Sequence, residues 1–319
     1  MLRCCKREPD QKVEVKALGV YPHSGRGQII VLLAMCLPAL IGAMALVADV
    51  GVLYFNWQLL QSAADAGAAA GASYLPSYPA LAISTADAFA RQNGIAPGEI
   101  LSTTVIVNNT ELNLQLQRSI PYSFATLLGL TTGIISAQAT AQVQTIGTAV
   151  GITPMGVDFQ TQYSSGQVVT LMQDQVGPGD WGPLALGGTG ASNLEQNIEY
   201  GYQGPVSVGD EVTTEPGQKA GPIRSAFNFL INEGESEDPG GTFANHTFND
   251  PRVLIVPMVN FSTAQGRSQV LVMGFAALWL VSVDGKDDIQ TYFINQVAPG
   301  STPDNNAPNY GAYKAVLIQ

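Results

Sequence analysis

Few residues of this chain are of the types that do acid–base, nucleophilic or metal chemistry, and their spacing matches no catalytic motif. His246 is the only histidine after residue 30, in the turn-like segment NHTFNDP. A Ser-His-Asp triad would have to use it, yet the G-x-S-x-G elbow that exposes a catalytic serine is missing from the sequence. The three cysteines, Cys4, Cys5 and Cys36, all lie near the N-terminus. Cys-His catalysis and a zinc site built on several Cys or His residues are therefore not expected.

Carboxylates cluster in two places: Glu233, Glu235, Glu237 and Asp238 in NEGESEDPGG, and Asp284, Asp287 and Asp288 in VDGKDD. The first cluster is typical of a solvated loop, with weak Ca²⁺ binding as the alternative. The second lacks the ligand spacing of an EF-hand and predicts a hairpin turn. The glycine-rich GPLALGGTGAS lacks the Lys-Ser/Thr of a phosphate loop. We therefore predict no catalytic residue, no metal and no cofactor, although two carboxylates could still meet across the fold as a glycosidase pair.

The elements that carry these residues begin with an apolar run, residues 29–48, which contains no charged or amide side chain. At ~1.5 Å per residue it spans ~30 Å, the thickness of a bilayer's hydrocarbon core. Six of the 14 Lys and Arg residues precede this run, and the next one after Arg26 is Arg91. By the positive-inside rule this predicts a cytoplasmic tail (1–27), one crossing (28–48) and export of everything after Asp49.

A cleaved signal peptide is the alternative to this anchor, since Ala43-Met44-Ala45 has the form of an A-x-A cleavage site. The apolar region of a removable signal is only about 7–15 residues long. The run at 29–48 is longer, and its helical pattern continues through the cleavage candidate. Both observations favour a retained anchor in the bacterial inner membrane, with the N-terminus cytoplasmic and the bulk periplasmic or extracellular.

Charge and composition limit what the exported part can bind and how it folds. The first 26 residues carry six basic and three acidic side chains, a net charge of +3. Since the whole chain has a net charge of −11, the remainder carries −14. Nucleic acid is an unlikely ligand for such a polyanion, because phosphate binding needs clustered Lys and Arg. Charged residues are 12% of the chain, while 34 Gly and 19 Pro favour a turn-rich, β-rich body over a helical bundle.

The helical pattern does not stop at residue 48. Helical spacing continues through Leu53, Trp57, Leu60, Ala64, Ala68, Gly71 and Leu75, and the helix is expected to end near Pro76 and Pro79. The same stripe contains small residues or proline inside the membrane, at Ala34, Pro38, Gly42 and Ala45. Small residues let helices approach closely in lipid, so this face is predicted to pack against partner helices or a second copy. A membrane anchor followed by a separate Ala-rich core helix is the alternative.

Two carboxylates, Asp49 and Asp65, interrupt this otherwise uncharged helix. Ionisable residues at a membrane are candidates for function, although Asp49 at the exit could simply meet water. The two lie sixteen residues apart, which is about 24 Å along the axis and ~160° around it. We therefore predict that they do not form one paired site.

Beyond the helix, the sequence predicts a small α+β module (49–146) and a β-rich, sandwich-like domain (147–319). In the module we expect a helix from Ser84 or Thr85 to Gly94, strands at 101–107, 111–120 and 134–143, and a helical turn from Pro121 to Gly129. In the domain we expect strands in GQVVTLMQ, 252–259, 269–283, IQTYFINQV and AYKAVLIQ, and one helix at 219–233. The apolar run 270–283 is too short to span a membrane.

The helix carries a family likeness, at Gly27, Asp49, Gly51, Tyr54, Leu60, Gln61, Ala64 and Asp65. Over roughly residues 27–75 this pattern resembles the N-terminal region of the TadG-like proteins of the Flp (tight-adherence) pilus assembly system. The resemblance implies a bacterial, inner-membrane-anchored protein that serves pilus assembly or adhesion, with a pilin-like module after the anchor. Prepilin-like members carry Glu five residues beyond their cleavage glycine, where this chain has Leu32. The Asp-x-Ser-x-Ser loop of von Willebrand factor A domains is also missing from the sequence.

The segments of residues 150–297 resemble uncharacterised exported domains that follow TadE- or TadG-like anchors, a likeness that implies no chemistry. The predicted function is that of a non-enzymatic, single-pass membrane component of Flp pilus assembly or adhesion. Its partners would be the membrane, other Tad proteins or itself. One alternative is an exported carboxylate-based hydrolase. Another is an adhesin-like glycan-binding module that uses exposed aromatic residues such as Trp181, Tyr200 and Tyr202.

Overall fold

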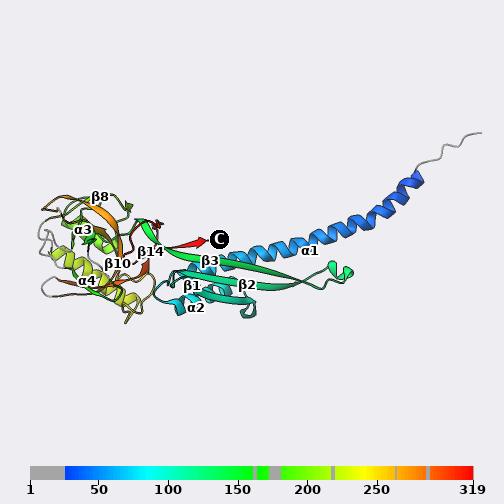
Figure 1. The fold of residues 1–319 in the computed structure, drawn as a ribbon, viewed down its shortest axis with the longest axis horizontal. Helices are drawn as coiled ribbons and strands as arrows, with labels where there is room; N and C mark the ends of the chain where they lie inside the picture. The colour runs from blue at the N-terminus through cyan, green and yellow to red at the C-terminus, as the bar shows by residue number, and fades with distance from the viewer. Residues whose placement is uncertain are drawn as a thin grey trace, which may run out of the picture. The chain divides into compact units, whose positions relative to one another are not determined.

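The computed structural model describes residues 26–160, 164–171, 181–216, 220–262, 264–284 and 288–318. The protein is α+β, as the sequence predicts, with one long apolar N-terminal helix and a β-rich C-terminal region (Figure 1). The chain divides into two compact units. The anchor unit contains Met1–Gly51 and Tyr122–Thr131, and the body unit contains Val52–Pro121 and Thr132–Gln319.

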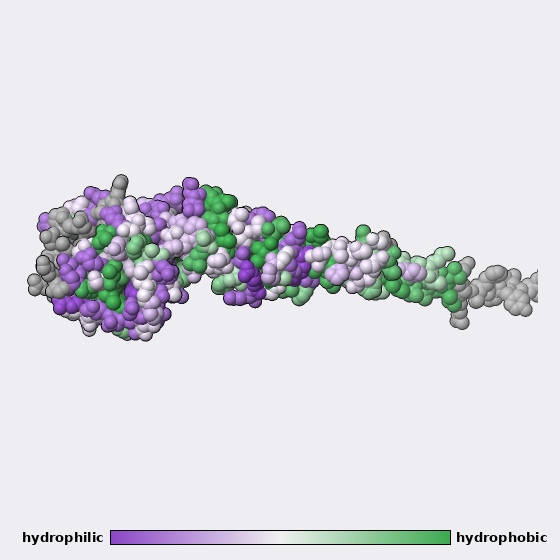
Figure 2. All heavy atoms as spheres, turned by 90° about the horizontal axis from the view of Figure 1, so that it is seen from below, coloured by the Kyte–Doolittle hydropathy of each residue, from purple (hydrophilic) through white to green (hydrophobic). Residues whose placement is uncertain are grey.

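Helix α1, Arg26–Ala72, is one continuous helix of 47 residues with Pro38 inside it. The predicted single helix is therefore confirmed, and the alternative of an anchor followed by a separate helix is wrong. Side chains at 29–44 are exposed, and the N-terminal part of α1 forms a hydrophobic surface in Figure 2. Among the described residues, α1 is the one helix long and apolar enough to cross a membrane.

The C-terminal half of α1 belongs to the core of the body unit. Its buried residues, Leu60, Ala63, Ala64, Ala68 and Ala72, pack with Leu112, Leu114 and Leu116 of a strand. Two glycines permit this close packing. A Cβ on Gly67 would lie 2.6 Å from the Leu114 Cδ2 atom, and one on Gly71 would lie 2.5 Å from the carbonyl oxygen of Ala82. The Ala- and Gly-rich sequence thus lets the next helix and the sheet approach the α1 backbone.

Helix α2, Pro79–Gln92, buries Ala82, Ala86 and Ala90. It begins at Pro79, so the predicted start at Ser84 or Thr85 is wrong. Proline suits the first position of a helix because its φ is already helical and its missing N–H would have no partner there. The predicted end is confirmed within two residues, since Gly94 takes the left-handed φ of +86° just after the helix. A 3-10 turn follows, Pro97–Glu99.

The first sheet begins with three antiparallel strands: β1 (Ile100–Ile106), β2 (Glu111–Pro121) and β3 (Thr132–Ala149). All three predicted strands are confirmed, and β2 buries the alternating leucines as expected. The β1–β2 turn uses left-handed backbone at Val107, Asn108 and Asn109. Between β2 and β3 lies the hairpin tip, Tyr122–Thr131, which contains the 3-10 turn η2 (Ala125–Leu128) that the sequence predicts.

Strand β14, Ala312–Ile318, completes this sheet by pairing with β3, from Tyr313 opposite Thr145 to Ile318 opposite Thr140. Strand β14 itself is as predicted. The sequence assigned it to the domain at 147–319, however, whereas its partner β3 belongs largely to the predicted module at 49–146. The predicted domain boundary at 146/147 stays a prediction, although β3 continues past it. Three short strands also join this sheet: β7 (Val206–Ser207), β12 (Gln296–Val297) and β13 (Thr302–Pro303).

The second sheet has β10 (Gln269–Val283) at its centre, in the order β5-β11-β10-β9-β4-β6, with β8 also paired to β10. The apolar run at 270–283 is therefore a buried central strand, as predicted. The other members are β4 (Met155–Asp158), β5 (Val168–Leu171), β6 (Trp181–Pro183), β8 (Glu211–Thr213), β9 (Val253–Val259) and β11 (Ile289–Ile294).

Two helices pack together in the body unit: α3 (Ala191–Tyr200) and α4 (Ala220–Glu237). They contribute Ile198 and Phe227 to a core shared with Leu278 of β10. The prediction of one helix is wrong because α3 was missed. That helix is ten residues long between glycines and buries only Leu194 and Ile198, too few apolar positions to show a helical period. The other core of the second sheet includes Ile146 of β3.

Candidate functional site

At the end of the apolar run, the Asp49 carboxylate binds the backbone of the hairpin tip. It accepts N–H hydrogen bonds from Ser123 (2.9 Å), Phe124 (3.0 and 3.3 Å) and Ala125 (2.7 Å). The first N–H groups of a helical turn have no partners within that turn, so the carboxylate supplies the acceptors they need. Asp49 is only 5% exposed. The alternative in which Asp49 simply meets water is therefore wrong.

The predicted intramembrane packing face makes little contact with the described protein. Ala34, Pro38 and Gly42 are exposed and Ala45 is half-buried. A Cβ on Gly42, or on Gly51 beyond the run, would meet nothing within 4 Å. The small residues thus leave space beside the helix, and their packing against a partner helix stays a prediction.

The rest of the family pattern is divided between the core and the surface. Leu60 and Ala64 are fully buried. Gln61 donates from Nε2 to the Asp65 carboxylate and to the carbonyl oxygen of Gln138 in β3, both at 2.9 Å. These motif residues therefore hold α1 against the first sheet. Asp49 and Asp65 have different partners, in agreement with the prediction that they do not form one site.

Tyr54 is the surface member of the pattern, and its ring stacks on that of Trp57. Gly27 lies in the first turn of α1.

Arg118 is an organising residue that the sequence analysis missed. Its guanidinium donates to Glu99 (2.6 and 2.9 Å), to the carbonyl oxygen of Gly94 (3.1 Å) and to Asn56 of α1 (3.3 Å). The bonds from Arg118, followed by that from the Ala96 N–H, hold the pKa of Glu99 below its usual range. The sequence contained an indication of this role: Arg118 continues the two-residue spacing of the buried leucines of β2, so its side chain starts on the same face of the strand. A charged residue on the core face of a strand needs a partner.

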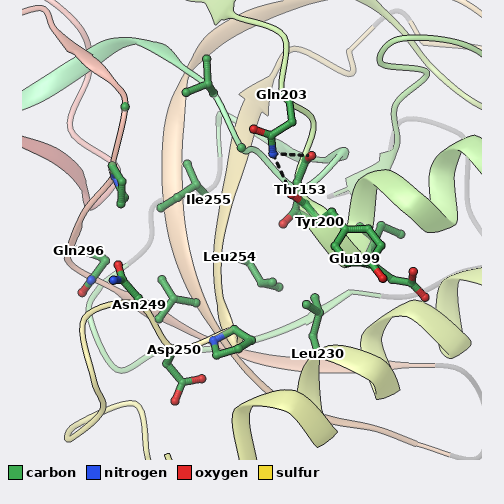
Figure 3. Close-up of a pocket in the computed structure, with 18 of the residues that line it drawn as sticks. Thr153, Glu199, Tyr200, Gln203, Leu230, Asn249, Asp250, Leu254, Ile255 and Gln296 are labelled. Carbon is green, nitrogen blue, oxygen red and sulfur yellow. Dashed lines mark hydrogen bonds between the residues drawn. The ribbon is translucent and has the colours of Figure 1, made fainter. Parts of the chain in front are cut away.

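The body unit contains a pocket of about 480 Å³ that has both polar and apolar walls. Polar walls come from Thr153, Gln203, Asn249 and Gln296, and apolar walls from Ile255, Leu254 and Leu230 (Figure 3). Two carboxylates border it, those of Glu199 and Asp250, but in Figure 3 they do not point toward one another. This pocket is the geometric candidate for the carboxylate pair that the sequence left open.

The Asp250 carboxylate is already bound by Arg252, through Nε (2.9 Å) and Nη2 (2.8 Å). The guanidinium also contacts Glu235 (3.1 Å) and lies 4.6 Å from the ring centroid of Trp279. Arg252 is buried, and a Cβ on Gly234 would lie 2.5 Å from its Nε atom. Gly234, the first glycine of NEGESEDPGG, thus leaves room for the buried guanidinium of Arg252.

The first acidic cluster is not the loop that the sequence predicts, although Glu233, Glu235 and Glu237 are exposed to solvent as expected. Glu233, Glu235 and Glu237 lie in the last turns of α4, while the Asp238 carboxylate accepts the N–H of Thr247 at 2.8 Å. The described residues contain no group of three or more His, Cys, Asp or Glu side chains placed to hold a metal.

The second cluster closes the β10–β11 turn, where the Asp284 N–H donates to the carbonyl oxygen of Asp288 at 2.9 Å. Asp287 lies outside the described residues.

The remaining candidates are a histidine and three aromatic residues. His246, the residue that a Ser-His-Asp triad would have to use, is half-buried, and its ring centroid lies 4.7 Å from that of Trp279. Tyr200 is 62% exposed at the pocket rim, whereas Tyr202 packs in the core of the second sheet. The side chain of Trp181 lies outside the described part of the chain.

Comparison with known proteins places this helix in a family. Residues 27–73 match the family model described as "Putative Flp pilus-assembly TadE/G-like". No curated protein and no solved structure matches the chain. The matched residues coincide with α1, from its first turn to its buried end. The resemblance drawn from the sequence is thereby confirmed for the N-terminal region: residues 27–73, on a candidate membrane-spanning helix, are similar to the TadE/G-like family of Flp pilus-assembly proteins.

Proposed function

We propose that this protein is a membrane-anchored, non-enzymatic component of Flp pilus assembly. Its N-terminal helix would stay in the bacterial inner membrane and bind partner helices, while the exported body makes protein or surface contacts. One observation carries the proposal: the TadE/G-like match coincides with a single helix, α1, that is exposed and apolar over 29–44 and enters the folded core from Leu60 onward.

Support for partner binding comes from the space beside the membrane part of α1. Gly42 has nothing within 4 Å of where its Cβ would be, and Ala34 and Pro38 on the same face are exposed. In lipid, where apolar side chains gain nothing by leaving solvent, helices associate through close packing at such small residues. A second membrane helix, from another Tad protein or from a second copy, is the partner that fits.

Gly42→Leu tests this proposal, with Ala43→Leu as the matched control, because Ala43 lies about 100° around the helix from Gly42 and outside the small-residue face. Other Tad proteins should co-purify with the full-length protein from membranes, and piliation should depend on it. We expect Gly42→Leu to reduce both co-purification and piliation, and Ala43→Leu to leave both unchanged. Normal piliation in a deletion strain would refute the proposal.

A surface-binding role for the body is the second candidate, and Tyr200 favours it. This ring is largely exposed at the rim of the pocket, beside the polar side chain of Gln203, an arrangement suited to stacking on a sugar. A carboxylate-based hydrolase has weaker support, because the Asp250 carboxylate is bound by Arg252. Binding of the full-length protein to a glycan array, compared with Tyr200→Ala, tests this second candidate.

A further inference from the structure

The hairpin tip presents apolar side chains at its surface. Leu127 is 87% exposed, Leu130 is 56% exposed and Phe124 is 46% exposed. The β1–β2 turn of the same sheet is more polar, because Asn108, Asn109 and Thr110 follow its one apolar residue, Val107. A turn that only reverses the chain in water is normally built from polar residues and glycine, as the Asn-Asn turn is. The composition of the tip therefore needs another explanation.

Charge is also missing from this part of the sequence. No Asp, Glu, Lys or Arg occurs between Arg118 and Asp158, a stretch that includes the whole tip. In a chain whose part beyond residue 26 carries a strong net negative charge, this uncharged stretch lacks the solubilising groups found elsewhere. A charged protein surface would find no opposite charge here to pair with. Insertion of apolar side chains into a lipid surface needs no such charge.

The anchor unit fixes the level of the tip relative to the membrane run. Asp49 is the first residue after the apolar run at 29–48, which matches the ~30 Å hydrocarbon core. The backbone nitrogens of Ser123, Phe124 and Ala125 lie 2.7–3.3 Å from its carboxylate oxygens. With the headgroup regions, a bilayer is about 40–45 Å thick, so Asp49 and the tip lie together in the interfacial layer.

The Asp49 contact also makes this position suitable for a carboxylate. A charge at the boundary of hydrocarbon loses part of its water, and backbone N–H donors replace that water. Asp49 is shielded in this way and remains buried, while Leu127 and Leu130 of the tip are exposed. The same contact therefore replaces water around the Asp49 carboxylate and fixes the hairpin tip that carries the exposed apolar side chains.

We propose that the hairpin tip, Tyr122–Thr131, docks onto the outer surface of the membrane that α1 crosses, with Phe124, Leu127 and Leu130 in the headgroup–acyl boundary. Asp49 holds it there. This gives the anchor two attachments to lipid, one transmembrane and one interfacial. The inference rests on the membrane crossing of the proposed function, and the experiment separates failure of the two.

The test places an environment-sensitive fluorophore at single cysteines of the full-length protein in phosphatidylcholine–phosphatidylglycerol vesicles. The background replaces Cys4 and Cys5 by Ser and Cys36 by Ala. Labels at Leu40→Cys, Leu127→Cys and Asn108→Cys report the membrane centre, the tip and the polar turn. We expect blue-shifted emission and quenching by doxyl-labelled lipids at positions 40 and 127, and neither at 108.

Each result has one meaning. Quenching at position 40 with position 127 behaving like 108 overturns the docking while the anchor stands. No quenching at position 40 refutes the crossing itself, and the docking with it. Adding Asp49→Ala should reduce quenching at 127 severalfold and leave position 40 unchanged. Full quenching at 127 in that variant would overturn the role of Asp49 in holding the tip.

Discussion

The Asp49 carboxylate lies 2.7 Å from the backbone nitrogen of Ala125, which is 76 residues later in the sequence. A side chain at the end of the apolar run thus contacts the turn between two strands. Three consecutive N–H groups of that turn point at one carboxylate. Hydrogen bonds to a charged group are shorter and stronger than those between neutral groups, so this contact is a strong local constraint.

Replacing Asp49 by Ala should release the tip without unfolding the body. The amides of residues 123–125 lose their acceptor and should exchange hydrogen for deuterium at least tenfold faster, since about 1.4 kcal/mol is a tenfold change. Hydrogen-exchange mass spectrometry on the full-length protein in nanodiscs measures this. Asp65→Ala removes a carboxylate of the same helix and serves as the control. Equal protection of 123–125 in the Asp49 variant and the wild type would contradict the prediction.

Gly71→Ala should destabilise the body unit. The new Cβ would lie 2.5 Å from the Ala82 carbonyl oxygen, so α1 and α2 must separate, at a cost of about 1–3 kcal/mol. Gly51→Ala on the same helix meets nothing within 4 Å and should be neutral or stabilising by up to about 1 kcal/mol. Thermal unfolding of both variants in the same detergent compares them. A Gly71 variant as stable as the Gly51 variant would be inconsistent with close packing of α1 and α2.

The Glu99–Arg118 pair should make stability depend on pH in the acidic range. Because the pKa of Glu99 is lowered on folding, chiefly by Arg118, the folded state binds fewer protons than the unfolded state. The contribution is present in full above the unfolded pKa of about 4.3 and disappears as pH falls through the lower folded value. Glu99→Gln should cost about 1 kcal/mol at pH 7, and this cost should shrink as the pH falls below the unfolded pKa.

Denaturant unfolding of wild type and Glu99→Gln at several pH values measures this difference. Glu111→Gln changes another glutamate of the same sheet and serves as the control. A stability difference between wild type and Glu99→Gln that stays constant from pH 7 to about pH 2 would rule out the pairing as its cause.

Replacing Arg252 alone should lower the free energy of unfolding more than replacing Arg252 and Asp250 together. Arg252→Met leaves the Asp250 carboxylate buried without its cation, and breaking such a pair costs about 3–5 kcal/mol. The double variant Arg252→Met/Asp250→Asn buries no unpaired charge and should recover part of that loss. Denaturant unfolding of the two single variants, the double variant and the wild type gives the coupling energy. Simple additivity of the two changes would show that the pair does not act as a unit.

The sequence was sufficient where a feature depends on neighbours in the chain. The length of α1 follows from one unbroken helical pattern, and the alternation of Leu112, Leu114 and Leu116 marks the buried face of β2. The N-terminal family likeness was also readable, because its residues lie within one helix. Helix α3 was not predicted, because its two buried residues, Leu194 and Ile198, are too few to establish a helical periodicity.

Contacts between distant segments were beyond the sequence. Asp49 was noticed as a candidate for function at the membrane exit, yet no local pattern connects it with Ala125. Arg252 stands just before an apolar strand, and although Asp250 is its neighbour in the sequence, its other carboxylate partner, Glu235, comes from helix α4. The pairing of β14 with β3 likewise depends on a register that two separated strands find only in three dimensions.

The pairing of β3 with β14 has a consequence for biosynthesis. Thr145 of β3 is translated long before its partner Tyr313, so the edge of β3 waits unpaired while the second sheet is made. Such a long-range contact slows folding, and an open strand edge invites pairing with other chains. The first sheet is therefore completed late, and a nascent chain that stalls before residue 312 would leave the edge of β3 open to pairing with other chains.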